Sequence, residues 1–254
     1  MNYKLPKLAI GLLFSVQCLT NVANAGLIDL NTWSQKGASN NGNWVVAADG
    51  TSVLQTTNGN PTFFVSDESF INNEFTGTFG VETASDDDYI GFVFGFNGLD
   101  DFYLFDWKQT NQNLGSFSGF EGFTLSKISA GADVSSLNPL WGHSGTGIDV
   151  LDTKYDTNLG WEDNVEYEFT LGYTNSSINI SINGGNFNNE NIFNITGLSN
   201  SAGSFGFYNA SQQSVRYTGF EEDVLPDPQS VPEPSTLAIL ALGMLGLSLR
   251  RAKK

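Results

Sequence analysis

Short segments of alternating apolar and polar residues fill the chain between residues 26 and 230. Residues 165–173 and 177–183 alternate at every second position, the pattern of strands that bury one face. Residues 89–96 are apolar at almost every position other than glycine, which predicts a central strand covered on both faces. Further strands are predicted at 44–47, 51–56, 74–82, 102–107, 122–129, 203–208 and 214–220.

This succession of strands is joined by turns rich in Gly, Asn and Asp, and helical periodicity nowhere exceeds a turn or two. A dozen or so short strands in about 200 residues predict an all-β domain, a two-sheet jelly-roll β-sandwich. The sequence of this region contains no internal repeat and no Pro/Ser linker. We therefore expect one domain at residues 26–225, between separate segments at 1–25 and 226–254.

The N-terminal segment has the layout of a cleavable signal peptide. Lys4 and Lys7 precede an apolar stretch at 8–18, and small residues lead to Ala25 and Gly26, between which we expect cleavage. A short N-terminal membrane anchor is the alternative. Cleavage would remove the single cysteine, so the mature protein could form no disulfide.

The C-terminal segment combines a proline-rich spacer with an apolar run. Pro232, Glu233 and Pro234 precede apolar residues 237–249, and four basic residues follow within 250–254. A helix from 234 to 249 would span roughly 24 Å, which is short for a hydrocarbon core of roughly 30 Å but compatible with insertion. We expect a short transmembrane helix at 237–249.

This order of features resembles the PEP-CTERM sorting signal of Gram-negative bacteria. The resemblance implies that an exosortase cuts near Pro232, Glu233 and Pro234, after transient membrane anchoring, and releases the domain to the envelope, surface or biofilm matrix. A plain anchor that is never cut is the alternative. Both interpretations place residues 26–230 outside the cytoplasm.

Charge and composition narrow the function classes. The chain of 254 residues has a formal net charge of -16, with 27 acidic and 11 basic residues. Residues 26–231 keep 26 of the acidic but only 5 of the basic residues, a formal charge of -21. This balance argues against nucleic-acid binding, which depends on Lys and Arg. One Cys and one His leave no zinc cluster and no Cys/His nucleophile pair.

Several motifs occur in an order that resembles a known family. The most specific is an Asp-Asp-Asp-Tyr segment at 86–89 with its aromatic strand, followed by Trp-Lys-Gln at 107–109; Asn58 to Pro61 precede them and Ser-Gln follows at 211–212. Over roughly residues 43–220 the sequence resembles the thrombospondin C-terminal domain, an L-type-lectin-like (concanavalin A-like) β-sandwich. The resemblance implies calcium binding and a matrix or adhesion role without catalysis.

Calcium is the strongest candidate cofactor, because it takes six to eight oxygen ligands and clustered carboxylates repel one another without a cation. If the strand has already begun, alternation sends Asp86 and Asp88 to one side and Asp87 to the other. Two further groups are expected as separate sites, one in the following turn and one in an irregular Gly/Thr-rich stretch. The alternative for every group is a solvated turn. The eight candidates are Asp86, Asp87, Asp88, Asp100, Asp101, Asp149, Asp152 and Asp156.

Two other functions stay open. A glycan-binding module is the second, with matrix polysaccharides or surface proteins as partners and Trp107, Trp141 and Trp161 as side chains that could stack on sugars. A glycoside hydrolase is the third, because Glu166 and Glu168 alternate along one predicted strand, although exposure on its polar face explains them as well. His143, the single histidine, has no evident Asp partner in the sequence and is expected to form hydrogen bonds within a loop.

Overall fold

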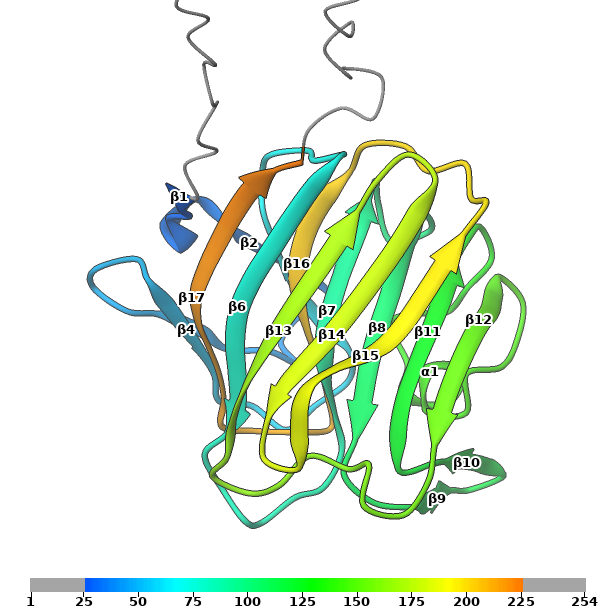
Figure 1. Ribbon diagram of the computed structural model, residues 1–254. Coiled ribbons are helices and arrows are strands. Elements are labelled where there is room, and N and C mark those ends of the chain that lie inside the picture. Colours follow the sequence, from blue (N-terminus) through cyan, green and yellow to red (C-terminus); the bar gives the residue numbers. More distant parts are fainter. Residues whose placement is uncertain (1–25, 226–254) are drawn as a thin grey trace, which may run out of the picture.

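Two antiparallel sheets pack face to face in the computed structural model, which describes residues 26–225 (Figure 1). The strands of the seven-stranded sheet are, in spatial order, β12 (Ile148–Tyr155), β11 (Gly122–Ile128), β8 (Phe102–Lys108), β7 (Tyr89–Phe96), β16 (Ser204–Ala210), β5 (Thr62–Val65) and β2 (Ser34–Gly37). Those of the eight-stranded sheet are β15 (Phe187–Thr196), β14 (Ser177–Gly184), β13 (Glu166–Tyr173), β6 (Asn73–Val81), β17 (Val215–Val224), β4 (Ser52–Gln55) and β3 (Trp44–Val46), with β1 (Gly26–Leu27) paired to β17. The short strands β9 (Gln112–Leu114) and β10 (Phe117–Gly119) form a separate hairpin.

The predicted all-β sandwich is therefore confirmed, and each predicted strand is present, whereas β2, β5, β12 and β15 were not predicted. Residues 165–173 and 177–183 correspond to β13 and β14, which pair directly and bury every second side chain. The alternation works because successive side chains of a strand point to opposite faces, so one face of each strand packs inward and the other meets water.

The central strand β7 is buried at all of its positions, as its sequence predicts. Ile90, Phe92 and Phe94 point into the main core between the sheets, whereas Tyr89 and Val93 belong to a second apolar cluster on the opposite face. Burying a side chain such as Phe92 stabilises the fold by about 1.5–3 kcal/mol. The seven-stranded sheet is thus covered on both sides.

The sequence pattern predicts cover on both faces of β7, but it does not predict the segment that covers the second face. The helix α1 (Leu137–Trp141) and the residues around it pack Leu140 and Trp141 onto the second cluster. A five-residue helix is too short for a hydrophobic period to be recognised. The 3-10 turn η1 (Leu30–Thr32) is similarly short.

Among residues 26–225, no helix has the length and apolar character needed to cross a membrane. The predicted signal peptide with Ala25, the sorting signal with Pro232, Glu233 and Pro234, and the apolar run 237–249 all lie outside the described residues.

Candidate metal centre

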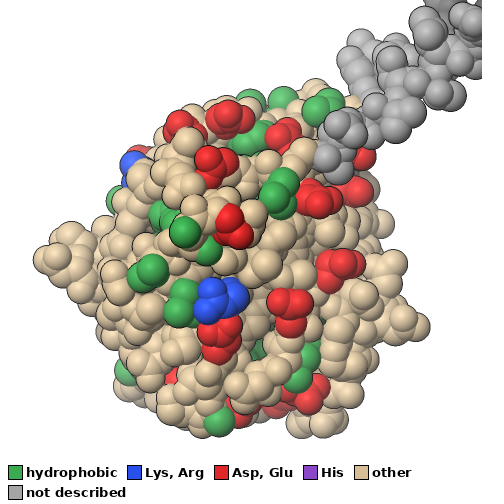
Figure 2. Space-filling view, turned by 90° about the vertical axis from the view of Figure 1, so that its left-hand side faces the viewer, with side chains coloured by type: hydrophobic (Ala, Val, Ile, Leu, Met, Phe, Trp, Pro, Cys, Tyr) green, Lys and Arg blue, Asp and Glu red, His purple; other side chains and the backbone are tan. Residues whose placement is uncertain are grey.

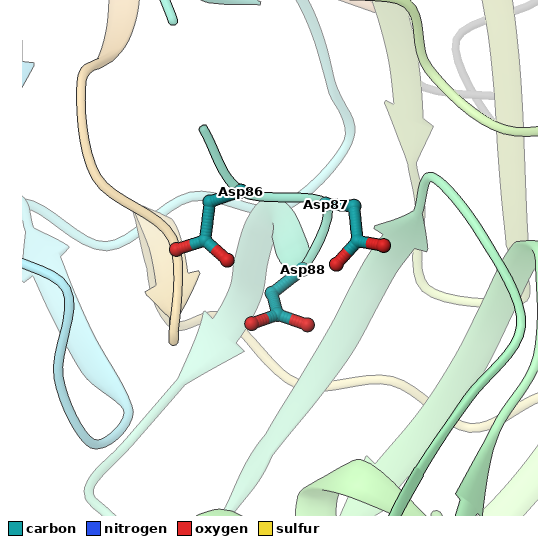
Figure 3. A group of neighbouring side chains, drawn as sticks. All are labelled: Asp86, Asp87 and Asp88. Carbon is teal, nitrogen blue, oxygen red and sulfur yellow. The ribbon is translucent and has the colours of Figure 1, made fainter. Parts of the chain in front are cut away.

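The three consecutive aspartates Asp86, Asp87 and Asp88 form one cluster directly before β7. One carboxylate oxygen of each lies within 4.8 Å of the others, and Figure 3 shows the three carboxylates close together at the entrance to the strand. Strand β7 begins only at Tyr89. The aspartates are therefore not yet in extended alternation, so the condition under which Asp87 would point away from the other two is not met, and the three carboxylates lie together. We call this group the aspartate cluster.

Each carboxylate of the aspartate cluster accepts a hydrogen bond from a different segment. Oδ2 of Asp86 accepts from the Asn58 amide, and Oδ2 of Asp87 accepts from the Thr110 hydroxyl. Oδ1 of Asp88 accepts from Nζ of Lys108 at 2.8 Å. Each of these three hydrogen bonds uses one oxygen of its carboxylate, which leaves the other oxygen of each to take part in ligand binding.

Lys108 is the buried cation of the cluster. Its ammonium also donates to the backbone carbonyl of Asp87 at 3.1 Å and to Oε1 of Gln112 at 2.9 Å. The same ammonium lies 4.5 Å from the ring centroid of Trp141, a cation–π contact. Three carboxylates and one ammonium leave a formal charge of -2 at this site. That is the charge that one divalent cation would neutralise.

The backbone of Asp88 is held from two sides. Its N–H donates to Oε1 of Gln212 at 2.9 Å, and its carbonyl accepts from the indole Nε1 of Trp161 at 3.0 Å. Both partners are almost fully buried. Hydrogen bonds of this kind, from groups that are themselves locked by packing, fix the direction of the carboxylate before any ligand arrives.

Burial and like charge act on Asp86. Desolvation, followed by the negative charge of Asp88, raises the pKa of Asp86 to about 6. A carboxyl group whose charge is disfavoured by its neighbours gains from a bound cation, which replaces the proton and offsets the repulsion.

The other acidic groups have different surroundings. Asp100 and Asp101 lie in the turn between β7 and β8, at the opposite end of β7, as expected for a separate group. Asp101 pairs with Nζ of Lys127 at 2.5 Å, and both side chains are partly exposed.

The expectation of an irregular stretch around Asp149, Asp152 and Asp156 is wrong, because the first two lie within the edge strand β12. Oδ1 of Asp152 and Oδ1 of Asp156 each accept from the N–H of the next residue. Within residues 26–225, the aspartate cluster is the one group of three acids close enough to share an ion.

The three tryptophans proposed for sugar stacking are buried. Trp107 is 0% exposed, Trp161 1% and Trp141 5%. Trp107 donates its indole N–H to the carbonyl of Leu159, and its ring packs in the main core. A buried ring presents no face to a glycan, so the interpretation of these three residues as a sugar platform is corrected.

His143 does have an acidic partner, contrary to expectation. Its Nε2 lies 2.7 Å from Oδ2 of Asp106, and both side chains are almost fully buried. Burial raises the pKa of Asp106, while His143 counteracts this effect. The partners are 37 residues apart, so no local motif could reveal the pair. Glu166 and Glu168 lie exposed on β13, as expected of its polar face.

Comparison with known proteins assigns most of the chain to described families. A model of the thrombospondin C-terminal region matches residues 39–223, and a model of the PEP-CTERM protein-sorting motif matches residues 230–252. Thrombospondin-3b of Danio rerio is 36% identical over 140 residues, which cover 52% of this chain and 15% of the relative. Cartilage oligomeric matrix protein of Rattus norvegicus is 37% identical over 137 residues, covering 51% of this chain and 18% of the relative. The chain thus matches a small part of these longer proteins.

One solved structure shows the same fold at low sequence identity, and a second aligns with a lower TM-score. The carbohydrate-binding module CBM66 from Bacillus subtilis aligns with a TM-score of 0.50 and 10% identity, covering 76% of this chain and 95% of the module. The exoplasmic/lumenal domain of VIP36 in its Ca2+-bound form aligns with a TM-score of 0.48 and 12% identity, covering 77% and 84%. At these identities the likeness concerns the sandwich and not the ligands.

Proposed function

Since the chain belongs to the thrombospondin C-terminal region family, we propose that it is an exported calcium-binding protein with a matrix or adhesion role, and that the aspartate cluster holds the ion. The observation that carries the proposal is the convergence of the Asp86, Asp87 and Asp88 carboxylates within 4.8 Å of one another, with only Asp88 paired to the ammonium of Lys108 among the residues that the structure describes. This arrangement concentrates negative charge where the fold is rigid.

The chemistry of the donors favours calcium among common metal ions. Calcium binds oxygen ligands at 2.3–2.6 Å and accepts irregular geometry and water in its shell. The three remaining carboxylate oxygens suit it, and waters would complete the shell. Transition metals favour imidazole and thiolate ligands, and the aspartate cluster contains neither.

Export and display follow from the sorting motif. A PEP-CTERM motif implies processing by an exosortase and a place at the cell surface, typically of a Gram-negative bacterium. We propose that residues 237–249 anchor the chain transiently and that cleavage near Pro232, Glu233 and Pro234 releases it. The matrix role is proposed from the name of a relative, cartilage oligomeric matrix protein, with matrix polysaccharides or surface proteins as partners.

The family is a non-catalytic one, and we propose that this chain likewise catalyses no reaction. The second candidate function, glycan binding, has one favourable observation. Phe120 and Tyr155 are 48% and 37% exposed, with ring centroids 5.2 Å apart. Exposed aromatic faces can stack on sugars. Binding to a glycan array that Phe120→Ala abolishes would support this function, whereas an array silent with and without calcium would remove it.

Calcium titration with matched variants tests the main proposal. We expect calcium to raise the melting temperature (Tm) of the wild-type protein, because a ligand that binds only the native state stabilises it. Asp87→Asn should weaken that rise strongly, since it removes a ligand charge from an accessible position. Asp100→Asn, in the turn at the other end of β7, is the control and should leave the rise unchanged. Equal losses in both variants, or no rise in the wild type, would refute the calcium site.

A further inference from the structure

A cavity of about 310 Å³ lies where β1 meets β17, and no residue of the aspartate cluster lines it. Trp33 and Phe70, both buried, contribute to its apolar wall. Its polar lining includes four acidic side chains: Asp29, Asp67, Glu68 and Glu222. Figure 2 shows the side of the molecule that carries β1, where acidic side chains gather and basic ones are sparse.

The negative charge of this cavity has no matching cation among the residues that the structure describes. None of its lining residues is Lys or Arg, and none of its four carboxylates belongs to an ion pair within residues 26–225. Burial, followed by the charge of Glu68, raises the pKa of Glu222. The Asn73 amide donates to the Glu222 carboxylate but supplies no charge.

The first described residue lies at this cavity. Gly26 lines it, and β1 places Gly26 opposite Glu222 in the antiparallel pairing with β17. Directly after β1, the N–H of Ile28 donates to the carbonyl of Phe220 at 3.0 Å, and this hydrogen bond fixes the register between β1 and β17. Strand β4 pairs only with Val215 to Thr218 of β17. Strand β1 therefore pairs with the part of β17 that β4 does not reach.

We propose that the cavity is a docking site for the α-ammonium group of Gly26, created when the signal peptide is removed. Hydrolysis of the peptide bond between Ala25 and Gly26 adds one water, leaves the new carboxylate on the departing Ala25, and gives Gly26 an amine that is protonated at neutral pH. That ammonium supplies the cation that the carboxylates of Glu222 and Glu68 lack. It holds β1 on the edge of the eight-stranded sheet, so maturation stabilises the fold.

This inference rests on the predicted cleavage after Ala25 and is independent of the calcium proposal. In the uncleaved chain the nitrogen of Gly26 is an uncharged amide, and the negative charge of Glu68 disfavours that of Glu222. In the cleaved chain the same position carries a positive charge. The effect of neutralising Glu222 should therefore change sign between the two forms.

The main experiment compares Glu222→Gln in two forms of the exported protein, one beginning at Gly26 and one with Ala25 retained by an extended N-terminus. In the form beginning at Gly26, Glu222→Gln should lower Tm by about 2–4 °C at pH 7, the change typical of losing one ion pair in a domain of this size. In the extended form it should leave Tm unchanged or raise it. Glu221→Gln, at the neighbouring exposed position of β17, is the matched control and should have no effect in either form.

The pH dependence gives a second, independent measurement. Because nearby carboxylates favour the charged form of an amine, we expect a folded-state pKa of the Gly26 amine above the ordinary range of about 7.7–8.0, with a stabilisation that disappears as pH rises through that pKa. Titration through the Gly26 ¹³Cα chemical shift should show a raised pKa that Glu222→Gln lowers. The titratable groups that line the cavity with Gly26 are Asp29, Asp67, Glu68 and Glu222, of which Asp29 also accepts hydrogen bonds from Asn31.

Four results would overturn the proposal. The first is an N-terminus of the mature protein, determined by mass spectrometry, at a residue other than Gly26. The second is an ordinary amine pKa that Glu222→Gln does not change. The third is an equal loss of stability in the two forms, which would indicate a merely structural role of Glu222. The fourth is a loss of calcium binding in the Glu222→Gln variant, which would show that a metal ion and not the ammonium group occupies the cavity.

Discussion

The two ends of β7 carry similar acidic sequences in opposite surroundings. At its start, the aspartate cluster is part-buried, contacts a fully buried lysine, and is supported by Gln212 and Trp161. At its end, Asp101 forms a partly exposed pair with Lys127. The density of carboxylates along the chain is comparable, so density does not distinguish the two. Three aspartates share one space only where other strands enclose them.

The lysines that pair with the aspartates at the two ends of β7 differ in the same way, one buried and one partly exposed. Lys108 has no exposed side-chain surface, whereas Lys127 keeps 29%. A buried ion pair is expensive to break because the remaining charge stays unsolvated, while an exposed pair is replaced by water at little cost. The largest expected differences between the two ends follow from this distinction.

Lys108→Met should therefore have the largest effect. We expect a loss of about 3–5 kcal/mol in the free energy of unfolding, because Asp88 would keep a buried charge without a partner. Lys127→Met, at the other end of β7, should cost at most about 1 kcal/mol. Urea denaturation measures both. Similar losses in the two variants would show that the two ends are energetically alike.

Calcium should act on one end only and in a pH-dependent way. At a calcium concentration about one hundred times Kd, the stability gain of about 2.7 kcal/mol corresponds to a rise in Tm of roughly 5–10 °C. Because the pKa of Asp86 is raised to about 6, a proton competes with the ion at lower pH. We expect a clearly smaller rise at pH 5 than at pH 7.5, measured by calorimetry.

The calcium-free protein should show the opposite trend at this group. A carboxyl group with a raised folded-state pKa contributes stability in its protonated form, and that contribution is lost as pH rises through about 6. Asp86→Asn should remove both the pH dependence of the calcium-induced rise in Tm and the pH dependence of stability without calcium. It should leave the ion pair of Asp101 with Lys127 unaffected. A rise in Tm with calcium that is equal at the two pH values would contradict the assignment of Asp86.

Gln212→Leu should have an intermediate effect. It leaves the buried N–H of Asp88 without an acceptor, which costs about 1–3 kcal/mol, and it frees the cluster to move. We expect weaker calcium binding in addition to lower stability. Gln213→Leu, a neighbouring position that is less buried, is the control. If both variants bind calcium as the wild type does, Gln212 does not position the site.

Asp152→Asn should have the smallest effect. Its side chain is exposed on the edge strand β12 and bonds only to the next backbone N–H among the hydrogen bonds of the described residues. A change within about 0.5 kcal/mol and an unchanged calcium response are expected. A loss of calcium-induced stabilisation in this variant would show that β12 carries a second site.

The sequence predicts most of the fold because alternation follows directly from strand geometry. It fails at β12, where an edge strand exposes side chains on both faces and the pattern loses its period of two. It also misses α1, whose packing onto the second face buries Trp141. The three tryptophans were wrongly assigned as sugar-stacking residues because the sequence does not show that aromatic residues pack against both faces of the seven-stranded sheet.

The aspartate cluster was predictable in its residues but not in its assembly. Asp86, Asp87 and Asp88 are adjacent in sequence, so their proximity is local information. Their partners Lys108 and Gln212 are 20 and 124 residues away from Asp88 and meet it only through the order of strands in the sheet. Both lie in motifs that resemble the thrombospondin C-terminal domain, yet the resemblance does not say that these motifs touch.

A crystal structure of the protein grown with calcium would test the central claim most directly, with anomalous scattering to identify the ion. The calcium proposal predicts an ion at the aspartate cluster, with carboxylate oxygens of Asp86, Asp87 and Asp88 at about 2.3–2.6 Å and no ion beside Asp100 and Asp101. A well-ordered aspartate cluster without an ion in saturating calcium would contradict it.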